Sequence, residues 1–271
     1  MIIVKLIGRL GNQLFQYAFA ISMQKRFGTY AVIDDRDQRD ILSEYFSIRG
    51  IYRHKLIKKI IFRFHRFPTV YQDGGEDPSQ FFSLNVKNHR YYSAYFQSEQ
   101  YFKEIRDELK KRIRIKKSFQ EAFQTKYGEL FSKNKILAIH YRFGDYLHWD
   151  KEGLGGPPFT LPDRYYKNAL AAIPDLDDHM VVLVTDDADL CDKETKHLKN
   201  KMIVSDSEIM DFQILLNADK LIIANSSFSW WAGYLNQKNA QVFAPEYWLG
   251  FKIGSEFPNA IIPEKYTRVR F

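Results

Sequence analysis

The sequence predicts an α/β protein with doubly wound parallel sheets, and three observations lead to this prediction. Short β-branched segments alternate along the chain with segments of helical length and periodicity, as in successive βαβ units. Most of the short segments are apolar throughout, which is typical of strands buried on both faces. The chain has 271 residues, which is enough for two small α/β domains.

The first residues of the chain predict one βαβ unit. Residues 2–7 form a β-branched apolar run, and residues 31–33 form a second one. Between them, residues 13–27 have helical periodicity, and Gly28 is placed to end that helix in a left-handed conformation. Because strands joined by a crossover helix pair in parallel, this order predicts the start of a parallel sheet.

The middle of the chain has weaker signals. Residues 67–90 contain several prolines and glycines and predict a loop, whereas residues 91–96 predict another strand. The polar stretch 116–135 separates the two α/β halves. We therefore expect an N-terminal domain at residues 1–130 and a C-terminal domain at residues 131–271.

The second half predicts a five-stranded doubly wound sheet. Its strands are expected at residues 136–140, 180–185, 202–204, 220–224 and 241–244. Helices are expected to begin near residue 160 and to span residues 207–217 and 227–235. Ligands of such open sheets bind beyond the carboxyl ends of the strands. The polar residues that follow each strand are therefore the candidate site residues.

Composition excludes several classes of protein. The single cysteine, Cys191, excludes a disulfide scaffold and a zinc site with several thiolates, and no HExxH motif is present. No apolar run approaches the roughly 20 residues of a membrane-spanning helix, and no charged leader precedes one. We therefore expect a cytoplasmic protein. Its formal net charge of +7 favours anionic partners such as nucleotides, nucleic acid or an anionic membrane.

The positive charge is uneven along the chain. Residues 103–117 contain eight Lys or Arg residues against three acidic ones, and residues 51–66 contain six Lys or Arg residues and no acidic residue. One interpretation is an ordinary solvated helix face. The other is a basic amphipathic helix that predicts peripheral contact with the inner membrane surface. Its apolar face would carry Ile57, Ile60, Ile61 and Phe64, with the basic residues Arg53, Lys55, Lys58, Lys59 and Arg66 largely elsewhere. We do not expect nucleic acid as a partner, because no recognition motif accompanies the charge.

Two polar clusters follow the first strands of the predicted sheets. Residues 8–13 place glycines between a strand and a helix, which allows an anion to approach the helix N-terminus, although an ordinary tight turn has the same pattern. They match neither the dinucleotide fingerprint nor the P-loop. Residues 140–146 deliver His140, Arg142 and Asp145 directly after a strand. Arg142 is suited to a diphosphate, or forms only a structural ion pair.

Two more clusters follow later strands. Asp186 and Asp187 follow a strand and are candidates for a metal, a ribose or no ligand at all, and one of them is a candidate helix cap. Asp211 lies on a predicted helix. Residues 225–231 place consecutive serines at a helix start, where they form either a phosphate cradle or an N-cap beside a packed Trp pair.

Four segments together resemble the motifs of the α-1,2-fucosyltransferases, glycosyltransferase family eleven, and they occur in the family's order. These segments are GRLGNQLFQYA at residues 8–18, YFQSEQYF at 95–102, HYRFGDY at 140–146 and NSSFSWW at 225–231. The resemblance implies a GT-B-like fold of two facing Rossmann-like doubly wound domains with a cleft between them. Residues 1–130 would be the acceptor-side domain, and residues 131–271 would bind the GDP-sugar.

The resemblance also implies an activity. The donor would be GDP-β-L-fucose, the acceptor the 2-hydroxyl of a terminal galactose on a glycan, and the reaction would invert the anomeric centre. No cofactor and no metal would be required. Two alternatives stay open: the same fold with another nucleotide sugar or acceptor hydroxyl, and a non-catalytic basic module that binds a glycan or nucleic acid.

Site roles follow from the resemblance residue by residue. Arg142 would hold the β-phosphate, with Gly11 and Asn12 near the diphosphate and His140 at the nucleotide. By a looser similarity to protein O-fucosyltransferases, Asp211 would bind the guanine. The remaining donor-binding candidates are Asp186, Ser226, Ser227 and Phe228.

Two points depart from the family pattern or stay open. Phe143 occupies the place of the second motif arginine, whose role would be absent or supplied elsewhere, with Arg9 as a candidate. A carboxylate is expected to take the proton of the acceptor hydroxyl. Asp145 belongs to the motif, and Asp150 has a spacing from His140 similar to that of the proposed base in core α-1,6-fucosyltransferases. Both are candidates, and a reaction without a dedicated base is the third possibility.

Overall fold

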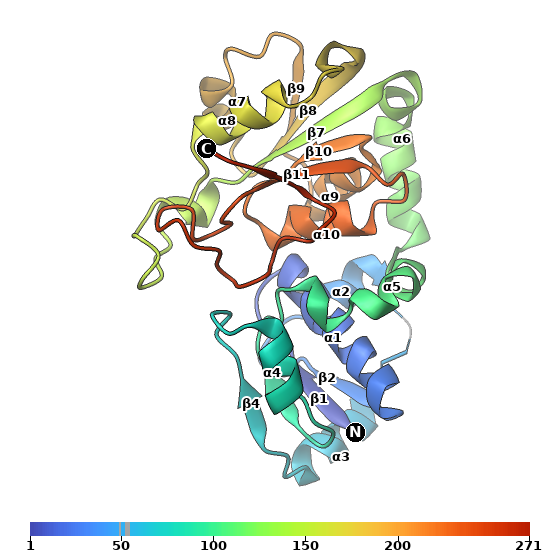
Figure 1. Ribbon diagram of the computed structural model, residues 1–271. Helices are drawn as coiled ribbons and strands as arrows, with labels where there is room; N and C mark the ends of the chain where they lie inside the picture. The colour runs from blue at the N-terminus through green and yellow to red at the C-terminus, as the bar shows by residue number, and fades with distance from the viewer. Residues whose placement is uncertain (49, 52–54) are drawn as a thin grey trace. The chain divides into compact units, whose positions relative to one another are not determined.

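The computed structural model describes residues 1–48, 50–51 and 55–271, and the chain forms two compact units (Figure 1). The first unit comprises Met1–Lys116 and Pro258–Ile261, and the second comprises Lys117–Phe257 and Ile262–Phe271. The division therefore falls before the expected position at residue 130. The reason is helix α6 (Lys117–Lys133), which packs against α9 (Glu208–Asn217) of the second unit.

The first unit contains the expected βαβ start. Strands β1 (Ile2–Lys5) and β2 (Ala31–Asp34) are parallel, and α1 (Leu10–Phe27) connects them. Both strands are almost completely buried, as their apolar sequences predict. Gly28 ends α1 with φ +56°, a left-handed conformation that glycine adopts without a steric penalty.

The sheet of the first unit has the order β2-β1-β5-β4, with β5 at Tyr91–Ser93 and β4 at Thr69–Tyr71. All its strand pairs are parallel. The loop expected at residues 67–90 is wrong in two places, because β4 and α4 (Pro78–Asn85) lie there. The proline that indicates a loop is instead the first residue of α4, where its missing N–H costs nothing.

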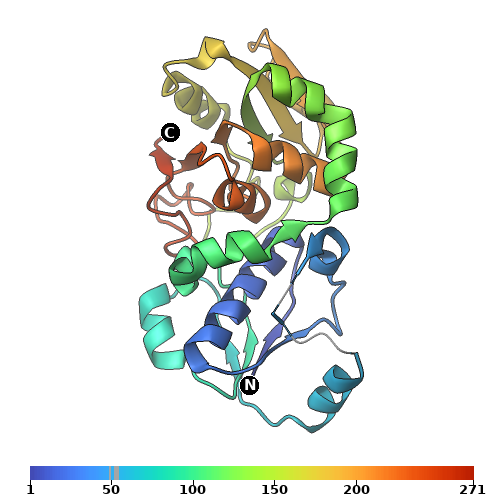
Figure 2. The same ribbon diagram turned by 90° about the vertical axis from the view of Figure 1, so that its right-hand side faces the viewer.

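Short elements complete the first unit. They are α2 (Ile41–Tyr45), β3 (Phe46–Ser47), α3 (Lys55–Phe64), η1 (Glu99–Tyr101), η2 (Lys103–Ile105), α5 (Arg106–Arg112) and β6 (Arg114–Ile115). Strands β3 and β6 form a separate antiparallel pair. Figure 2 shows α1 lengthwise across the sheet. An aromatic core joins α1 to the residues after β5, where the rings of Phe19 and Phe96 stack with centroids 3.8 Å apart.

The second unit contains a six-stranded parallel sheet with the order β12-β11-β10-β7-β8-β9. Its strands are β7 (Lys135–Tyr141), β8 (His179–Thr185), β9 (Lys201–Val204), β10 (Lys220–Ile222), β11 (Gln241–Pro245) and β12 (Thr267–Val269). Numbered along the unit, this is the Rossmann order 3-2-1-4-5-6 read from the other edge. Strand β12 was not expected, because only Val269 of its three residues is buried.

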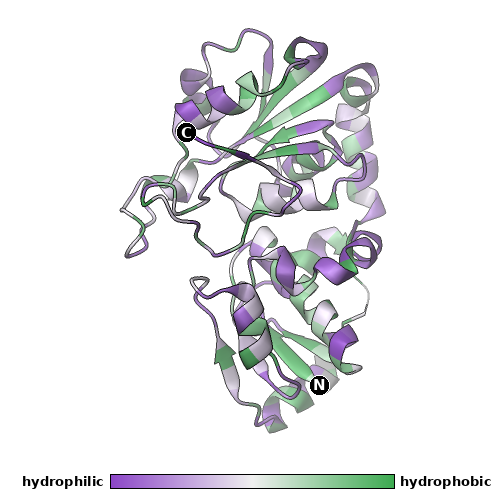
Figure 3. Cartoon of the chain, viewed as in Figure 1, coloured by the Kyte–Doolittle hydropathy of each residue, from purple (hydrophilic) through white to green (hydrophobic). Residues whose placement is uncertain are grey.

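Helices cover both faces of this sheet (Figure 1). They are α6, α7 (Asp163–Ala171), α8 (Ala188–Glu194), α9 and α10 (Ser227–Leu235), with short turns η3 (Gly144–Leu147) and η4 (Leu176–Asp178). Figure 3 shows hydrophobic residues concentrated in the central strands of both sheets. The fold class is therefore confirmed as α/β with Rossmann-like units. Among the described residues, no helix has the length and apolar character that a membrane span requires.

Candidate functional site

In the second unit the candidate residues gather where the strand order reverses. The chain leaves β7 for β8 on one side and returns later to β10 on the other side, so the crevice beyond β7 and β10 is the expected ligand site of a Rossmann sheet. Arg142 follows β7, Asp186 follows β8, and Ser226 lies between β10 and α10. The structure thus brings together residues that are up to 84 positions apart in sequence.

Arg142 lies between two carboxylates. Its Nη1 donates to Oδ2 of Asp186 at 2.5 Å, and its Nη2 donates to Oδ1 of Asp145. The other oxygen of Asp186 accepts the backbone N–H of Phe143 at 2.8 Å. Asp186 therefore orients the guanidinium and the turn that carries it, which is a different role from binding a ribose or a metal directly.

The turn after Arg142 requires a glycine. Gly144 has φ +35°, and a Cβ at this position would lie 2.5 Å from Oδ2 of Asp186. The hydrogen of glycine leaves room for the carboxylate to reach Arg142. Tyr146, two residues after Gly144, donates a hydrogen bond from its hydroxyl to the carbonyl of Asn225 at 3.0 Å and so joins this turn to the loop before α10.

His140 is buried and neutral. Burial, with the charge of Arg142 as the second cause, lowers the pKa of His140 to about 3. Its Nδ1 lies 2.9 Å from Oγ of Ser229 on α10, and its ring lies 5.7 Å from that of Phe228. A neutral imidazole adds no positive charge for a phosphate. His140 instead fixes the start of α10 against the end of β7.

The N-terminus of α10 is open. Ser226 is its N-cap residue but forms no side-chain cap, so the first backbone N–H groups of the helix, including that of Ser227, are available to an anion or to water. Phe228 packs against Phe212 of α9 with ring centroids 5.3 Å apart. This contact holds the helix start close to α9, the helix that carries Asp211.

Asp211 has an unusual protonation equilibrium. Burial raises its pKa to about 7, and the neighbouring charges of Asp206 and Asp186 act in the same direction. Its Oδ1 accepts the backbone N–H of Asp206 at 3.1 Å. A carboxyl group with this pKa changes its charge near neutral pH. Two N–H donors on a ligand would strongly stabilise its ionised form.

The other sequence candidates of the second unit differ in their surroundings. Asp150 is exposed in the loop after η3, and within the described residues no ion pair joins it to Arg142, which is paired with Asp145 and Asp186. Trp149, in the same loop, stacks near Tyr146 at 6.1 Å and is 38% exposed. Phe143 is buried and stacks on Tyr141 at 6.0 Å. The position of the second motif arginine thus faces the core, where a charge would be costly.

In the first unit the candidate residues also lie where the strand order reverses, beyond β1 and β5. Gly11 and Asn12 lie in the first turn of α1, whose N-cap residue, Arg9, forms no side-chain cap. Oδ1 of Asn12 accepts a hydrogen bond from Nε2 of Gln97 at 2.7 Å. A Cβ on Gly8 would lie 2.4 Å from Nδ2 of Asn12, so glycine makes room for the amide.

Gln97 is a site residue that the sequence analysis did not single out, although it lies in the second motif. The sequence places Gln97 directly after a predicted strand, but it does not indicate the hydrogen bond to Asn12, which lies 85 positions away. By using Oδ1 of Asn12 as an acceptor, Gln97 fixes the orientation of the amide. The Nδ2 group of Asn12, which has no acceptor among the described residues, is then the part left to bind a ligand.

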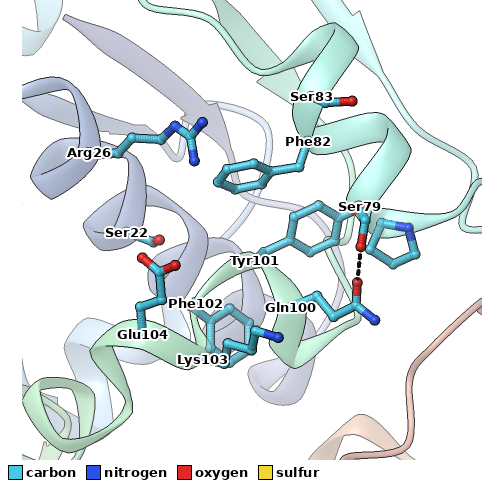
Figure 4. Close-up of a pocket in the computed structure, with 11 residues that line it drawn as sticks. Ser22, Arg26, Ser79, Phe82, Ser83, Gln100, Tyr101, Phe102, Lys103 and Glu104 are labelled. Carbon is cyan, nitrogen blue, oxygen red and sulfur yellow. Dashed lines mark hydrogen bonds between the residues drawn. The ribbon is translucent and has the colours of Figure 1, made fainter.

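A pocket of about 270 Å³ in the first unit lies away from these residues. Figure 4 shows it between α1, α4 and the η1–η2 segment, with the guanidinium of Arg26 beside the ring of Phe82. Oγ of Ser79 donates to Oε1 of Gln100 at 2.7 Å at its edge. None of the predicted site residues lines this pocket.

The side chains that could bind metal are dispersed. Among the described residues, no three His, Cys, Asp or Glu side chains are grouped as ligands of one ion. The carboxylates of Asp145 and Asp186 are already paired with Arg142.

The family model for glycosyl transferase family 11 matches residues 1–258. The chain belongs to this family. It is therefore a glycosyltransferase with the GT-B-like fold that the motifs predict. Its relatives include an α-1,2-colitosyltransferase of Escherichia coli, 24% identical over 99% of this chain and 98% of the relative. Another is the O-antigen biosynthesis glycosyltransferase WbnK of E. coli, 26% identical over 90% of this chain and 93% of the relative.

Solved structures support the same fold. A crystal structure of NodZ α-1,6-fucosyltransferase soaked with GDP-fucose has a TM-score of 0.56 with this family 11 chain and is 18% identical. The match covers 86% of this chain and 92% of NodZ. At this level of identity the likeness concerns the fold.

Proposed function

We propose that this family 11 glycosyltransferase transfers L-fucose from GDP-β-L-fucose to the 2-hydroxyl of a terminal galactose, with inversion and without a metal. The observation that carries the proposal is the guanidinium of Arg142 beyond β7, held by Asp145 and Asp186, beside the open N-terminus of α10. The remaining N–H groups of the guanidinium and those at the helix start can donate hydrogen bonds to a phosphate, and both lie at the end of the sheet where Rossmann folds bind nucleotides.

The second unit supplies the groups that a GDP leaving group needs. As C1 of the sugar leaves the β-phosphate, negative charge grows on the diphosphate, and Arg142 with the N–H groups at Ser226 and Ser227 would stabilise it. Arg142 uses one N–H of each Nη for its carboxylates, so other N–H groups stay available to a phosphate. Asp186 acts as the positioning residue for this guanidinium.

Asp211 would recognise the base. An ionised carboxylate can accept the two neighbouring N–H groups of guanine, which adenine and uracil do not offer in the same arrangement. Phe228, which packs on the same helix, offers a ring close by. This assignment makes GDP binding dependent on the ionisation of Asp211.

In the first unit, Asn12 would donate hydrogen bonds from Nδ2 to an anionic group of a substrate, with Gly11 and the open start of α1 in the same role. The proton of the acceptor hydroxyl would pass to Asp145 or Asp150. The carboxylate of Asp145 is 49% exposed but paired with Arg142, whereas Asp150 is exposed beyond that cluster. Alanine substitution of each, with the pH dependence of kcat, separates the two candidates.

A second donor is supported by one specific observation. The α-1,2-colitosyltransferase relative covers nearly the whole chain, and colitose is L-fucose without its 3-hydroxyl. GDP-colitose is therefore the alternative donor. A site that binds the 3-hydroxyl would reject colitose strongly, whereas a site without such a contact would accept both sugars.

Product analysis tests the proposal. Incubation with GDP-fucose and, separately, GDP-colitose, with a panel of galactosides, should give an α-1,2-linked product from GDP-fucose. The linkage is read by NMR. Transfer only from GDP-colitose would show that the donor is GDP-colitose and not GDP-fucose. Transfer to another hydroxyl would show that the acceptor is not the 2-hydroxyl of galactose. No transfer from either GDP-sugar would refute the proposal.

Metal independence is tested separately. EDTA should leave the transfer rate unchanged, because Arg142 and the helix N-terminus carry the charge stabilisation in this account. Strong inhibition that Mn²⁺ reverses would contradict it.

A further inference from the structure

Helix α3 of the first unit is attached with its apolar side outward. Lys58 forms an ion pair with Asp35, and the guanidinium of Arg36 lies 4.4 Å from the ring of Phe62. Just beyond the helix, the ring of His65 stacks on Tyr91 at 5.7 Å. These contacts fix one face of α3 to the residues after β2 and to β5.

The opposite face of α3 is apolar and exposed. Leu56, Ile60 and Phe64 follow one another at four-residue spacing and are 62%, 51% and 67% exposed. Lys59 and Arg63 are exposed beside this stripe, and neither has a carboxylate partner among the residues that the structure describes. Figure 2 shows α3 at the lower edge of the first unit, beyond the sheet.

This arrangement revises the face expected from sequence. Lys58 was expected on the solvated basic side but is only 12% exposed in its ion pair. Ile61 is half-buried rather than outward. Arg53 and the side chains of Lys55 and Ile57 lie outside the described residues. The exposed stripe is therefore formed by Leu56, Ile60 and Phe64.

We infer that α3 docks on an anionic lipid surface. In such docking a helix inserts its apolar side into the headgroup boundary, while adjacent Lys and Arg side chains bind lipid phosphates. Lys59 and Arg63 have the position and charge that this requires. Each basic residue near an anionic surface strengthens binding about fivefold.

Charge decides between the candidate occupants. Residues 55–66 contain no acidic residue, so a second copy of this surface would be repelled. Nucleic acid would attract Lys59 and Arg63 but leave Leu56, Ile60 and Phe64 exposed to water. An anionic lipid surface satisfies the charges and also removes the apolar side chains from water.

Vesicle flotation of the full chain tests the inference. The protein should float with vesicles of phosphatidylcholine and phosphatidylglycerol at 7:3 and not with phosphatidylcholine alone. The double variant Lys59→Glu, Arg63→Glu should lose at least about 25-fold in affinity. The variant Ile60→Ser, Phe64→Ser should also detach, with unchanged thermal unfolding and unchanged transfer to a soluble galactoside.

A matched control lies on α4, where Leu84 is 60% exposed and Lys87 is exposed nearby. The variant Leu84→Ser, Lys87→Glu should float like the parent. Absence of flotation by the parent protein, equal loss in the α4 control, or capture by an oligonucleotide in place of vesicles would overturn the inference.

An environment-sensitive fluorophore gives a second readout. Cys191 is buried, so Phe64→Cys can be labelled selectively. The label should brighten on addition of the anionic vesicles, whereas a label at Leu84→Cys should not change. A constant signal at position 64 in a protein that floats would show that another surface binds lipid and would refute the role of α3.

Discussion

In the first unit, the residues that follow β1 and β5 bond to one another through Asn12 and Gln97, whereas in the second unit the residues that follow β7 and β8 form a charged cluster around Arg142. Both sets occupy the point where the strand order of their sheet reverses. At the same point of a Rossmann-like sheet, the first unit therefore has neutral amide donors and the second unit has a guanidinium held by carboxylates. We expect the charged unit to dominate binding and catalysis.

The largest expected effect is the loss of Arg142. Arg142→Ala should lower kcat by at least about 10²–10³-fold, because it removes a donor aimed at developing charge. Circular dichroism should show an intact fold, and Arg142→Lys should recover only part of the rate because lysine lacks the paired donors. Near-normal transfer by Arg142→Ala would show that another group stabilises the negative charge on the diphosphate.

Asp211 should give the next largest effect. Asp211→Asn should weaken GDP binding about 10–100-fold at pH 8, measured by calorimetry, because a charged acceptor is lost. In the parent protein the pKa of about 7 means that GDP affinity should fall up to tenfold per pH unit below pH 7. A pH-independent affinity would contradict the guanine assignment.

The same residue makes a stability prediction with a defined sign. The folded protein holds a proton on Asp211 up to about pH 7, whereas the unfolded chain releases it near pH 4. The free energy of unfolding therefore falls as pH rises between these values. Without ligand, Asp211→Asn should unfold at a higher temperature than the parent at pH 8, with a smaller difference near pH 4.

The neutral amides of the first unit should matter less. Asn12→Ala should lower kcat/KM roughly 10-fold, and Gln97→Leu somewhat less, because Gln97 acts through Asn12. A double-mutant cycle should show strong coupling, with Gln97→Leu nearly silent in the Asn12→Ala background. Additive effects would mean that Gln97 does not position Asn12.

The smallest effect is expected at Ser229. Ser229→Ala removes the partner of His140 Nδ1 and should lower stability by about 1 kcal/mol, because one buried hydrogen bond is lost. Chemical denaturation measures this change. A large loss of kcat without a loss of stability would indicate that His140 has a direct catalytic role.

Much of the fold could be predicted because its strands carry their own signal. The central residues of β1, β7 and β8 are apolar, and the strand ends position Arg142 and Asp186. β4 and β12 were missed because their residues are mostly exposed and resemble loop sequence. Side-chain partnerships such as Gln97 with Asn12 depend on the tertiary fold, and local sequence contains no signal for them.

Thermal unfolding with nucleotides tests the central claim, that the charged cluster of the second unit holds the GDP of the donor. At 100 times its dissociation constant, GDP should add about 2.7 kcal/mol to the free energy of unfolding and raise the unfolding temperature by several degrees. ADP and UDP should add much less, and Arg142→Ala should lose most of the GDP effect. Equal stabilisation by all three nucleotides, or an undiminished GDP effect in Arg142→Ala, would contradict the account.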